Sequence, residues 1–275
     1  MRAIAAMTVA LLLSGCSATG YDLAAIAPAA ASPARMTSGF EASVMVAHPR
    51  FGDRKPTSWP GKTPWSYAVH GTDVSKYQSE IDWSAAKESG ISFAFIKATE
   101  GGDRLDERFM QNWNATRVHG IPRSAYHFYY FCRPAIEQAR WFIRNVPKEP
   151  GSLPHVLDME WNHLSPSCKL RPNAQIVQRE MKIFLDAIEA HYGKRPIIYT
   201  SVDFYEDNRL ASFKGYHWWL RSVAAHPHDR YEDEDFLFWQ YTGTGIVPGK
   251  RGDADINVFN GSVREWREWV AKNTS

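Results

Sequence analysis

The chain has 275 residues, of which 44% are hydrophobic and 23% are charged, which suits one large globular domain with attachments. Its formal net charge is only +2 and no run of Lys or Arg stands out, so the charge pattern gives no support for nucleic-acid binding. Aromatic residues are abundant, with 11 Trp, 12 Tyr and 14 Phe, and most of them are expected in the core.

The N-terminus has the pattern of an export signal. Arg2 supplies a positive charge, and residues 4–13 form an apolar run that is too short to span a bilayer. The run ends in Leu-Ser-Gly-Cys, which resembles the lipobox of bacterial lipoproteins and implies removal of residues 1–15 and a lipid on Cys16. An ordinary secretory signal with a chance Cys is the alternative. Either reading predicts an exported protein, lipid-anchored in the bacterial envelope or secreted.

Residues 16–66 are expected to form a tether followed by an arm. The segment from Ser17 to about Arg35 is rich in Ala, Ser and Pro, which predicts a flexible tether. The next residues hold four Pro together with Trp59 and Trp65, which suggests an irregular arm that packs on the domain. The folded domain is therefore expected from residue 67 to residue 275.

From Ala68 onward, strand patterns alternate with helix patterns. Apolar or aromatic runs predict strands at residues 68–70, 91–98, 124–131, 155–160, 197–199, 216–220, 236–241 and 256–259. Amphipathic segments predict helices at 83–88, 106–119, 134–146, 174–192, 204–210 and 263–272. This alternation predicts a parallel sheet, because parallel neighbours need long crossovers. About eight strands favour a closed α/β barrel with fewer helices in its second half. A doubly wound open sheet is the alternative, but no Gly-rich phosphate loop follows any strand.

The stretch from Val156 to Trp161 is apolar except for two acids, Asp158 and Glu160. Side chains alternate along a strand, so Asp158 and Glu160 point the same way, about 7 Å apart. Two acids on a poorly hydrated face cannot both ionise easily, so one pKa should rise. A raised carboxyl beside an ionised one is what acid-catalysed cleavage of a glycosidic bond needs. A strand end whose acids face water or cap the next helix is the alternative.

Other strands also carry polar residues near their carboxyl ends. These interruptions are Asp73, Lys97 to Glu100, His127, Asp158 with Glu160, and Gln240. In a β/α barrel the carboxyl ends of the strands surround one active site. The recurrence therefore favours a catalytic reading of the two acids.

Two cysteines remain in the chain once Cys16 is set aside. Cys132 ends one predicted strand, and Cys168 lies in the loop after the strand with the two acids. An exported protein can keep a disulfide, so we predict that Cys132 and Cys168 pair and brace that loop. Two separate buried thiols are the alternative.

Seven stretches follow one another over about 190 residues in an order typical of one family. They are GTDVSKYQ at 71–78, FIKATEG at 95–101, AYHF at 125–128, LDME at 157–160, IYT at 198–200, FWQY at 238–241 and DINVFNG at 255–261. They resemble the lysozymes of glycoside hydrolase family 25, which are muramidases that cut bacterial peptidoglycan. The resemblance implies a flattened, irregular β/α barrel. It also implies hydrolysis of the β-1,4 bond between N-acetylmuramic acid and N-acetylglucosamine by a monomer without metal or cofactor.

The resemblance further implies four acidic catalytic residues. Glu160 would be the general acid that protonates the departing oxygen. Asp158 would stay ionised and either orient the N-acetyl group of the substrate or stabilise the oxocarbenium-like transition state. Asp73 and Asp255 would flank the cleft and keep Glu160 protonated by like-charge repulsion. Asp253 is a nearby rival for the position of Asp255.

Further residues in the matching stretches are expected to contact substrate. Lys97 would bind acidic groups such as a lactyl carboxylate, although an internal counter-ion for the four acids is an equal alternative. His127 would be a hydrogen-bonding wall residue without a role in proton transfer. The remaining expected contacts are Glu100, Tyr126, Tyr199, Trp239, Gln240 and Tyr241. For the aromatic residues, a place in the core is the alternative.

The preferred mechanism is net retention through the acetamido group of the substrate, because no separate carboxylate is clearly placed as a nucleophile. A non-catalytic wall-binding module on the same barrel is the alternative function. A family 18 chitinase is disfavoured, because its further acids would fall at Leu153 and Val156. His226 and His228 lack an evident third ligand, so a metal site is not expected.

Overall fold

The structure is a computed structural model that describes residues 46–162, 165–232 and 234–274. Cys16, the predicted signal peptide and the tether lie outside the described residues. The main strands are β2 (His70–Val74), β3 (Ile91–Glu100), β5 (Arg123–Phe128), β6 (Val156–Met159), β7 (Ile197–Thr200), β8 (His217–Arg221), β9 (Phe238–Ile246) and β10 (Ala254–Phe259). Two short strands are β1 (Gly52–Asp53) and β4 (Arg104–Leu105).

The helices match the predicted positions closely. They are α2 (Trp83–Glu88), α3 (Phe109–Val118), α4 (Ala135–Asn145), α5 (Ala174–Tyr192), α6 (Val202–Asp207) and α7 (Val263–Thr274). Short 3₁₀ turns lie at η2 (Pro64–Ser66), η3 (Lys76–Gln78), η4 (Leu210–Ser212) and η5 (Pro227–Asp229). Helix α5 has the predicted bounds: the side chain of Asn173 accepts from the backbone N–H of Ile176 at 3.0 Å, and Gly193 ends the helix at φ 73°.

The eight main strands close into a barrel in the order β2-β3-β5-β6-β7-β8-β9-β10. Neighbours from β2 to β9 are parallel, which confirms the predicted parallel sheet. Strand β10 differs, because it is antiparallel to both β9 and β2 and closes the barrel between them. The connection at residues 247–253 is too short for a crossover helix, so β9 and β10 can pair only as a hairpin.

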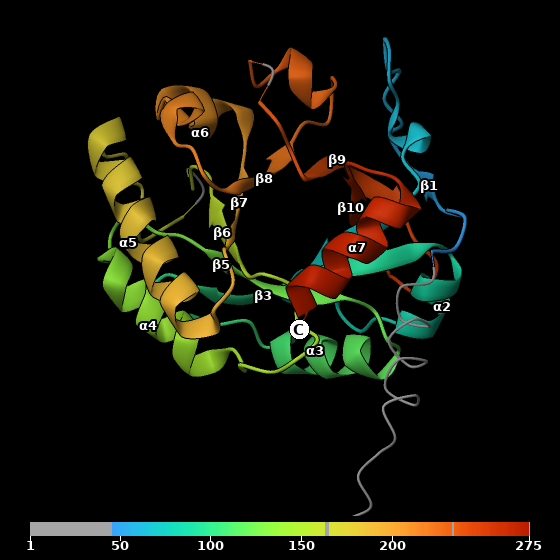
Figure 1. Cartoon of the computed structure of the whole chain (residues 1–275), viewed down its shortest axis with the longest axis horizontal. Coiled ribbons are helices and arrows are strands. Elements are labelled where there is room, and N and C mark those ends of the chain that lie inside the picture. Colours follow the sequence, from blue (N-terminus) through green and yellow to red (C-terminus); the bar gives the residue numbers. More distant parts are fainter. Residues whose placement is uncertain (1–45, 163–164, 233, 275) are drawn as a thin grey trace, which may run out of the picture.

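The helices are distributed unevenly around this barrel. Helices α3, α4 and α5 cover the strands of the first half, whereas only short helical turns accompany β7, β8 and β9 (Figure 1). The prediction of fewer helices in the second half is therefore confirmed. No helix among the described residues is both apolar enough and long enough to cross a bilayer.

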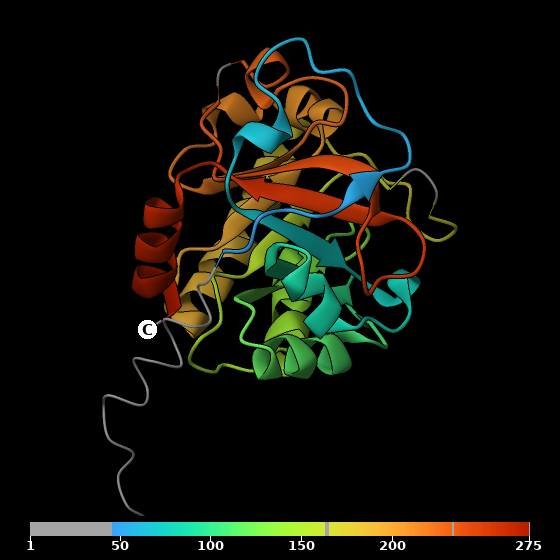
Figure 2. The same ribbon diagram turned by 90° about the vertical axis from the view of Figure 1, so that its right-hand side faces the viewer.

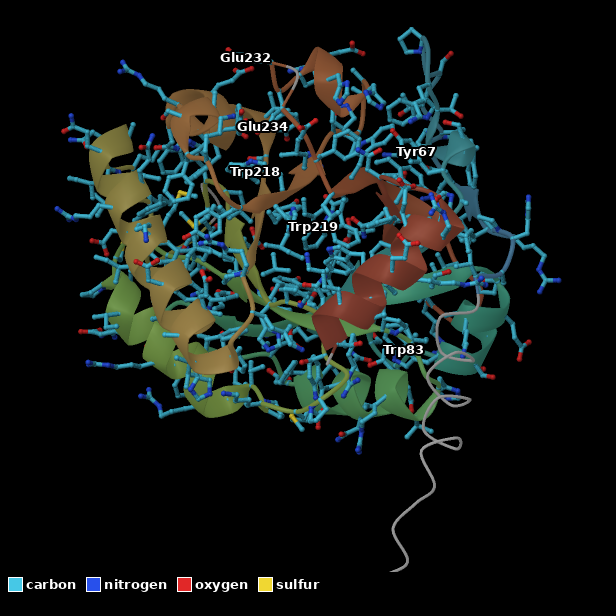
Figure 3. All side chains as sticks on the ribbon, viewed as in Figure 1. Tyr67, Trp83, Trp218, Trp219, Glu232 and Glu234 are labelled. Atoms are coloured by element: carbon cyan, nitrogen blue, oxygen red, sulfur yellow. A yellow bond between two sulfur atoms is a disulfide. The ribbon has the colours of Figure 1, made fainter. Side chains whose placement is uncertain are left out.

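The interior of the barrel is filled by large aromatic side chains. Phe93, Phe95, Trp219 and Phe238 belong to one buried cluster, and Trp219 lies near the centre of the barrel in Figure 3. Helix α7 adds Trp266 to this cluster and covers the end of the barrel at which the parallel strands begin; it lies at the left of Figure 2. Because α7 closes that end of the barrel, a substrate can enter only at the opposite end, where the parallel strands end.

The described part of the arm packs on residues of β9 and β2. Strand β1 pairs antiparallel with the end of β9, with Gly52 opposite Ile246. The ring of Trp59 lies edge-on to Trp239 at 5.1 Å between centroids, and Trp65 stacks on His70 at 5.6 Å. These contacts agree with the expectation that the arm packs on the domain.

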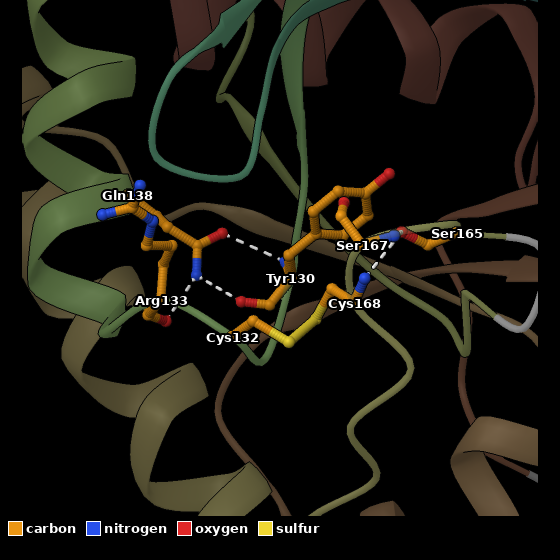
Figure 4. Close-up of a disulfide and its surroundings, with 7 residues drawn as sticks. All are labelled: Tyr130, Cys132, Arg133, Gln138, Ser165, Ser167 and Cys168. Atoms are coloured by element: carbon orange, nitrogen blue, oxygen red, sulfur yellow. Dashed lines mark hydrogen bonds between the residues drawn. A yellow bond between two sulfur atoms is a disulfide. The ribbon is translucent and has the colours of Figure 1, made fainter.

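A disulfide joins Cys132 to Cys168, with a Cα–Cα distance of 5.8 Å. It links the loop after β5 to the loop after β6, as Figure 4 shows. The predicted pairing is thus present, and it ties down the loop that follows the strand with the two acids.

Candidate active site

The alternation along β6 places the two acids as the sequence predicts. Val156 belongs to the cluster inside the barrel, whereas Leu157 and Met159 belong to the cluster between the strands and the helices. Asp158 and Glu160 therefore face the interior, at the end of the barrel opposite α7. Both line a cleft with a volume of about 490 Å³.

The other two predicted acids line the same cleft. Asp73 comes from β2 and Asp255 from β10, and the two residues lie directly opposite each other in the antiparallel register. The complete lining consists of Asp73, Ser75, Tyr77, Lys97, Tyr126, Phe128, Asp158, Glu160, Trp161, Tyr199, Ser201, Asp203, Trp219, Arg221, Gln240 and Asp255. Because β10 runs antiparallel, its first residues, rather than its last, reach this end of the barrel.

Hydrogen bonds from neighbouring strands fix Asp73. Its Oδ2 accepts from Nδ2 of Asn257 at 2.8 Å and from Nε2 of Gln240 at 2.9 Å. The hydroxyl of Tyr199 donates to Oε1 of Gln240 at 3.0 Å, which orients that amide. Burial raises the pKa of Asp73, and the two amide donors and Lys250 oppose this rise.

Burial also raises the pKa of Glu160, to about 7. The positive charge of Arg221 opposes this rise, whereas the negative charge of Asp203 adds to it. A carboxyl with this pKa is half protonated at neutral pH, so it can both give and accept a proton. This is the property required of a general acid.

The environment of Asp158 differs from the expectation of a permanently ionised carboxylate. Burial raises its pKa well above the usual range, and the negative charge of Glu160 raises it further. Its Oδ1 atom is buried and has no hydrogen-bond partner among the described residues. An ionised Asp158 therefore needs a hydrogen-bond donor, and the described residues of the free protein do not supply one.

Asp255 rather than Asp253 is the acid of the cleft. Burial and the charge of Asp73 raise the pKa of Asp255 to about 8, and the ammonium group of Lys250 opposes this. Lys250 donates from Nζ to Oγ1 of Thr72 at 2.8 Å, and burial lowers its own pKa to about 8. Asp253 instead forms an ion pair with Arg54 and is 40% exposed.

Lys97 lines the cleft, but it already forms an ion pair with Glu100. Its Nζ lies 2.7 Å from Oε2 of Glu100, and its charge opposes the rise in the pKa values of both Asp158 and Glu160. This geometry favours the internal counter-ion. Glu100 does not line the cleft; it also accepts from the hydroxyl of Tyr130 at 2.5 Å and anchors Lys97. The expected contact of Glu100 with substrate is therefore corrected.

His127 also does not contact the cleft. It is fully buried, its Nε2 donates to Oε1 of Gln138 at 3.0 Å, and its Nδ1 accepts from Oγ1 of Thr99 at 2.7 Å. Its ring stacks on Phe184 of α5, and burial lowers its pKa to about 4. The expectation of a wall residue is wrong because Tyr126 faces inward, and its neighbour in the strand must face outward.

Trp239 and Tyr241, which were expected to contact substrate, also lie outside the cleft. Gln240 faces the cleft, so the residues on either side of it face the arm. Nε1 of Trp239 donates to the backbone oxygen of Ser222 at 2.7 Å, and the hydroxyl of Tyr241 lies 3.2 Å from Nδ1 of His70. Neither aromatic ring lines the cleft.

Tyr126, Tyr199 and Gln240 lie in the cleft as predicted. Sequence reasoning did not identify Arg221 and Asp203, which set the charge around Glu160. The alternation of side chains along β8 could have predicted that Arg221 faces the cleft, because Arg221 lies two residues after the inward-facing Trp219. Asp203 has no comparable signal, since it lies in the short helix α6.

The four predicted carboxyl groups surround an open cleft at the end of the barrel where the parallel strands end, and one of them has a pKa of about 7. This arrangement is typical of a glycoside hydrolase. The comparison with known families gives the particular class. Residues 72–250 match the model of the Glycosyl hydrolases family 25, and the chain belongs to this family.

The chain is also similar to individual proteins. The YegX protein of Escherichia coli is 37% identical over 80% of this chain and 80% of its own length. Lysozyme M1 of Streptomyces globisporus is 35% identical over 71% of this chain and 69% of its own length. A family 25 glycosyl hydrolase from Bacillus anthracis superposes with a TM-score of 0.69 at 33% identity, covering 76% of this chain and 96% of that one.

Proposed function

We propose that this protein is a muramidase that hydrolyses the β-1,4 bond between N-acetylmuramic acid and N-acetylglucosamine in peptidoglycan. The observation that carries the proposal is Glu160, whose pKa of about 7 suits a proton donor, beside the buried Asp158 in an open cleft. The similarity to Lysozyme M1 and to an N,O-diacetylmuramidase of Arthroderma benhamiae, 32% identical over half of this chain, supports the same substrate.

In the proposed reaction, Glu160 donates its proton to the glycosidic oxygen as the bond to the anomeric carbon breaks. The carbonyl oxygen of the acetamido group attacks that carbon from the opposite face and forms a cyclic oxazolinium ion. Water then adds to the same carbon and gives a proton back to Glu160, while the ring reopens. Two inversions give net retention of configuration.

The unpartnered Oδ1 of Asp158 supports this role of the acetamido group. An N–H of the substrate would supply the missing donor, and the positive charge of the oxazolinium ion would favour the ionised form of Asp158. Asp73 and Asp255 complete a negative cleft that stabilises the same positive charge.

Purified bacterial walls test the activity. We expect the protein to clear wall suspensions and to release fragments whose reducing ends are N-acetylmuramic acid. Glu160→Gln should lower the rate by about 10²-fold to 10⁴-fold, because it keeps the shape but removes the transferable proton. The exposed Glu107 offers a matched control, and Glu107→Gln should keep full activity. A protein that pellets with walls but does not clear them would instead be a binding module.

The stereochemistry has its own test. NMR of the first product formed should show the β-anomer, because retention preserves the configuration of the β-linked glycan. An initial α-anomer would exclude retention and the acetamido route, while leaving the muramidase activity standing.

We also propose that the protein is exported and carries a lipid on Cys16. The apolar run at residues 4–13 and the cysteine that follows it support this proposal. Detergent phase partitioning of the full chain made in a bacterial host tests it. The unchanged chain should enter the detergent phase, and Cys16→Ser should remain in the aqueous phase. Equal partitioning of both would contradict lipidation.

We also propose that the enzyme acts as a monomer, because the four predicted acids of the cleft belong to one barrel and the proposed reaction needs no residue of a second copy. Sedimentation of the exported domain should give the mass of a single chain.

A further inference from the structure

A second, smaller hollow adjoins the cleft beside Glu160. Its volume is about 110 Å³, and it shares Glu160 and Trp161 with the cleft. Its other wall comes from the loop after β6, where Lys169, Leu170 and Arg171 lie. The charged side chains of this other wall are both cations, whereas the cleft is lined mainly by acids.

The two cations of this wall are available for a ligand. Lys169 and Arg171 are both exposed, and neither forms an ion pair with any acid of the described residues. Lys97, in contrast, is paired with Glu100. The guanidinium of Arg171 lies over the ring of Trp161, 5.0 Å from its centroid, which holds this charge at the edge of the cleft.

Trp161 itself is fixed in place. Its Nε1 donates to Oδ2 of Asp207 at 2.8 Å, and its ring contacts Phe204 at 4.6 Å between centroids. The position of Arg171 over this ring is therefore set by a rigid support.

The disulfide fixes the start of the cationic segment. Cys168 is bonded to Cys132, and the backbone N–H of Cys168 donates to Oγ of Ser165 at 3.0 Å (Figure 4). On the other side, Nε2 of Gln138 donates to the backbone oxygens of Tyr130 at 2.7 Å and Arg133 at 2.9 Å. A segment held in this way loses little conformational entropy when it binds a ligand.

The proposed substrate determines which ligand this position would take. Glu160 marks the bond that is cleaved, and the muramic sugar at this bond carries a lactyl group from which the peptide stem of peptidoglycan extends. The stem bears free carboxylates and must leave the cleft within reach of Glu160. The acids of the cleft would repel these carboxylates, so cations at the exit would offset the repulsion.

We propose that Lys169 and Arg171 form a binding site for the acidic peptide stem, so that the enzyme prefers glycan strands that carry peptides over bare strands. This inference rests on the proposed muramidase function. Leu170, which is 56% exposed between the two cations, provides an apolar contact for the aliphatic part of the stem.

Kinetics on two forms of one glycan test the proposal. The first substrate is soluble peptidoglycan strands with their stems, and the second is the same strands after an amidase has removed the stems and left the lactyl carboxylates. For the double variant Lys169→Gln/Arg171→Gln, we expect KM to rise about fivefold on the first substrate and to stay unchanged on the second. The charge-preserving Lys169→Arg/Arg171→Lys should retain most of the preference.

A matched control separates this effect from general attraction between a basic protein and acidic walls. Arg264 and Arg267 are exposed on α7, at the other end of the barrel. Arg264→Gln/Arg267→Gln removes the same charge and should leave KM on both substrates unchanged. An equal rise of KM on both substrates for the Lys169/Arg171 variant, or no rise on either, would overturn the proposal.

A binding measurement keeps the inference distinct from the proposed activity. Calorimetry on the Glu160→Gln protein should show weaker binding of a peptide-bearing disaccharide when Lys169 and Arg171 are also replaced, and no change for the peptide-free disaccharide. If the unchanged protein hydrolysed neither glycan, the proposed function would fail, and this comparison would still decide whether the two cations bind the stem. Equal affinities with and without the two cations would refute the inference directly.

Discussion

Asn257 donates a hydrogen bond from Nδ2 to Oδ2 of Asp73 at 2.8 Å, joining β10 to β2. The same amide accepts from Nε1 of the buried Trp219 at 2.7 Å. One side chain thus links the aromatic interior of the barrel to an acid of the cleft, and it holds that carboxylate in a site where burial alone would favour the protonated form.

Asn257→Ala should therefore destabilise the fold by about 1 to 3 kcal/mol, because the indole N–H of Trp219 is left buried without a partner. Urea denaturation followed by Trp fluorescence measures this change. Asn114→Ala, on the exposed face of α3, serves as the control and should change stability little. An equal effect of both variants would show that the buried amide has no special role.

Arg221 should set the upper pH limit of activity. Its positive charge favours ionised Glu160, so Arg221→Gln should raise the pKa of Glu160 above its value of about 7. Because the general acid works in its protonated form, the basic limb of kcat/KM should move to higher pH. Arg221→Lys should leave the limb near its original place. A shift of the limb to lower pH in Arg221→Gln would contradict the assignment of Glu160 as the acid.

Glu160→Gln should be more stable than the unchanged protein at alkaline pH. The folded-state pKa of about 7 lies above the ordinary value of 4.5, so this group contributes its full stability below pH 4.5. That contribution is lost as pH rises to 7, and the amide loses nothing over the same range. The advantage of the variant should grow from near zero at pH 4 to on the order of 3 kcal/mol at pH 8. Denaturation curves across this range, with Glu107→Gln as the control, measure it; a constant difference would refute the raised pKa.

Removal of the disulfide should destabilise the domain. The bond spans 36 residues, and closing a loop of this length stabilises by about 3 to 4 kcal/mol through the unfolded state. Cys132→Ser/Cys168→Ser should therefore unfold at a clearly lower denaturant concentration. Thiol titration of the unreduced exported domain should find neither Cys132 nor Cys168 reactive, and two titratable thiols would contradict the pairing.

The sequence alone determined the features that depend on local periodicity. The alternation along Val156 to Glu160 places both acids on one face of a strand wherever that strand lies. The bounds of α5 follow equally from local signals, because Asn173 caps its start and Gly193 ends it. The order of strands and helices was sufficient to predict the barrel.

Only the tertiary structure decided which face of each strand looks into the cleft. The strands of this barrel are buried on both faces. The two faces therefore do not differ in polarity, and the sequence does not show which face points into the barrel. By sequence pattern alone, His127, Trp239 and Tyr241 are therefore as suitable for the cleft as Tyr126 and Gln240, although adjacent residues cannot share a face.

The electrostatic environment of Glu160 also could not be predicted without the folded structure. Lys97 is paired by Glu100 three residues away, but Arg221 and Asp203 act on Glu160 from other elements of the fold. Electrostatic energies depend on distance and burial, neither of which sequence spacing provides for residues on different strands. The sequence therefore placed Asp158 and Glu160 together on one face of a strand, and the closed barrel decided the pKa of Glu160.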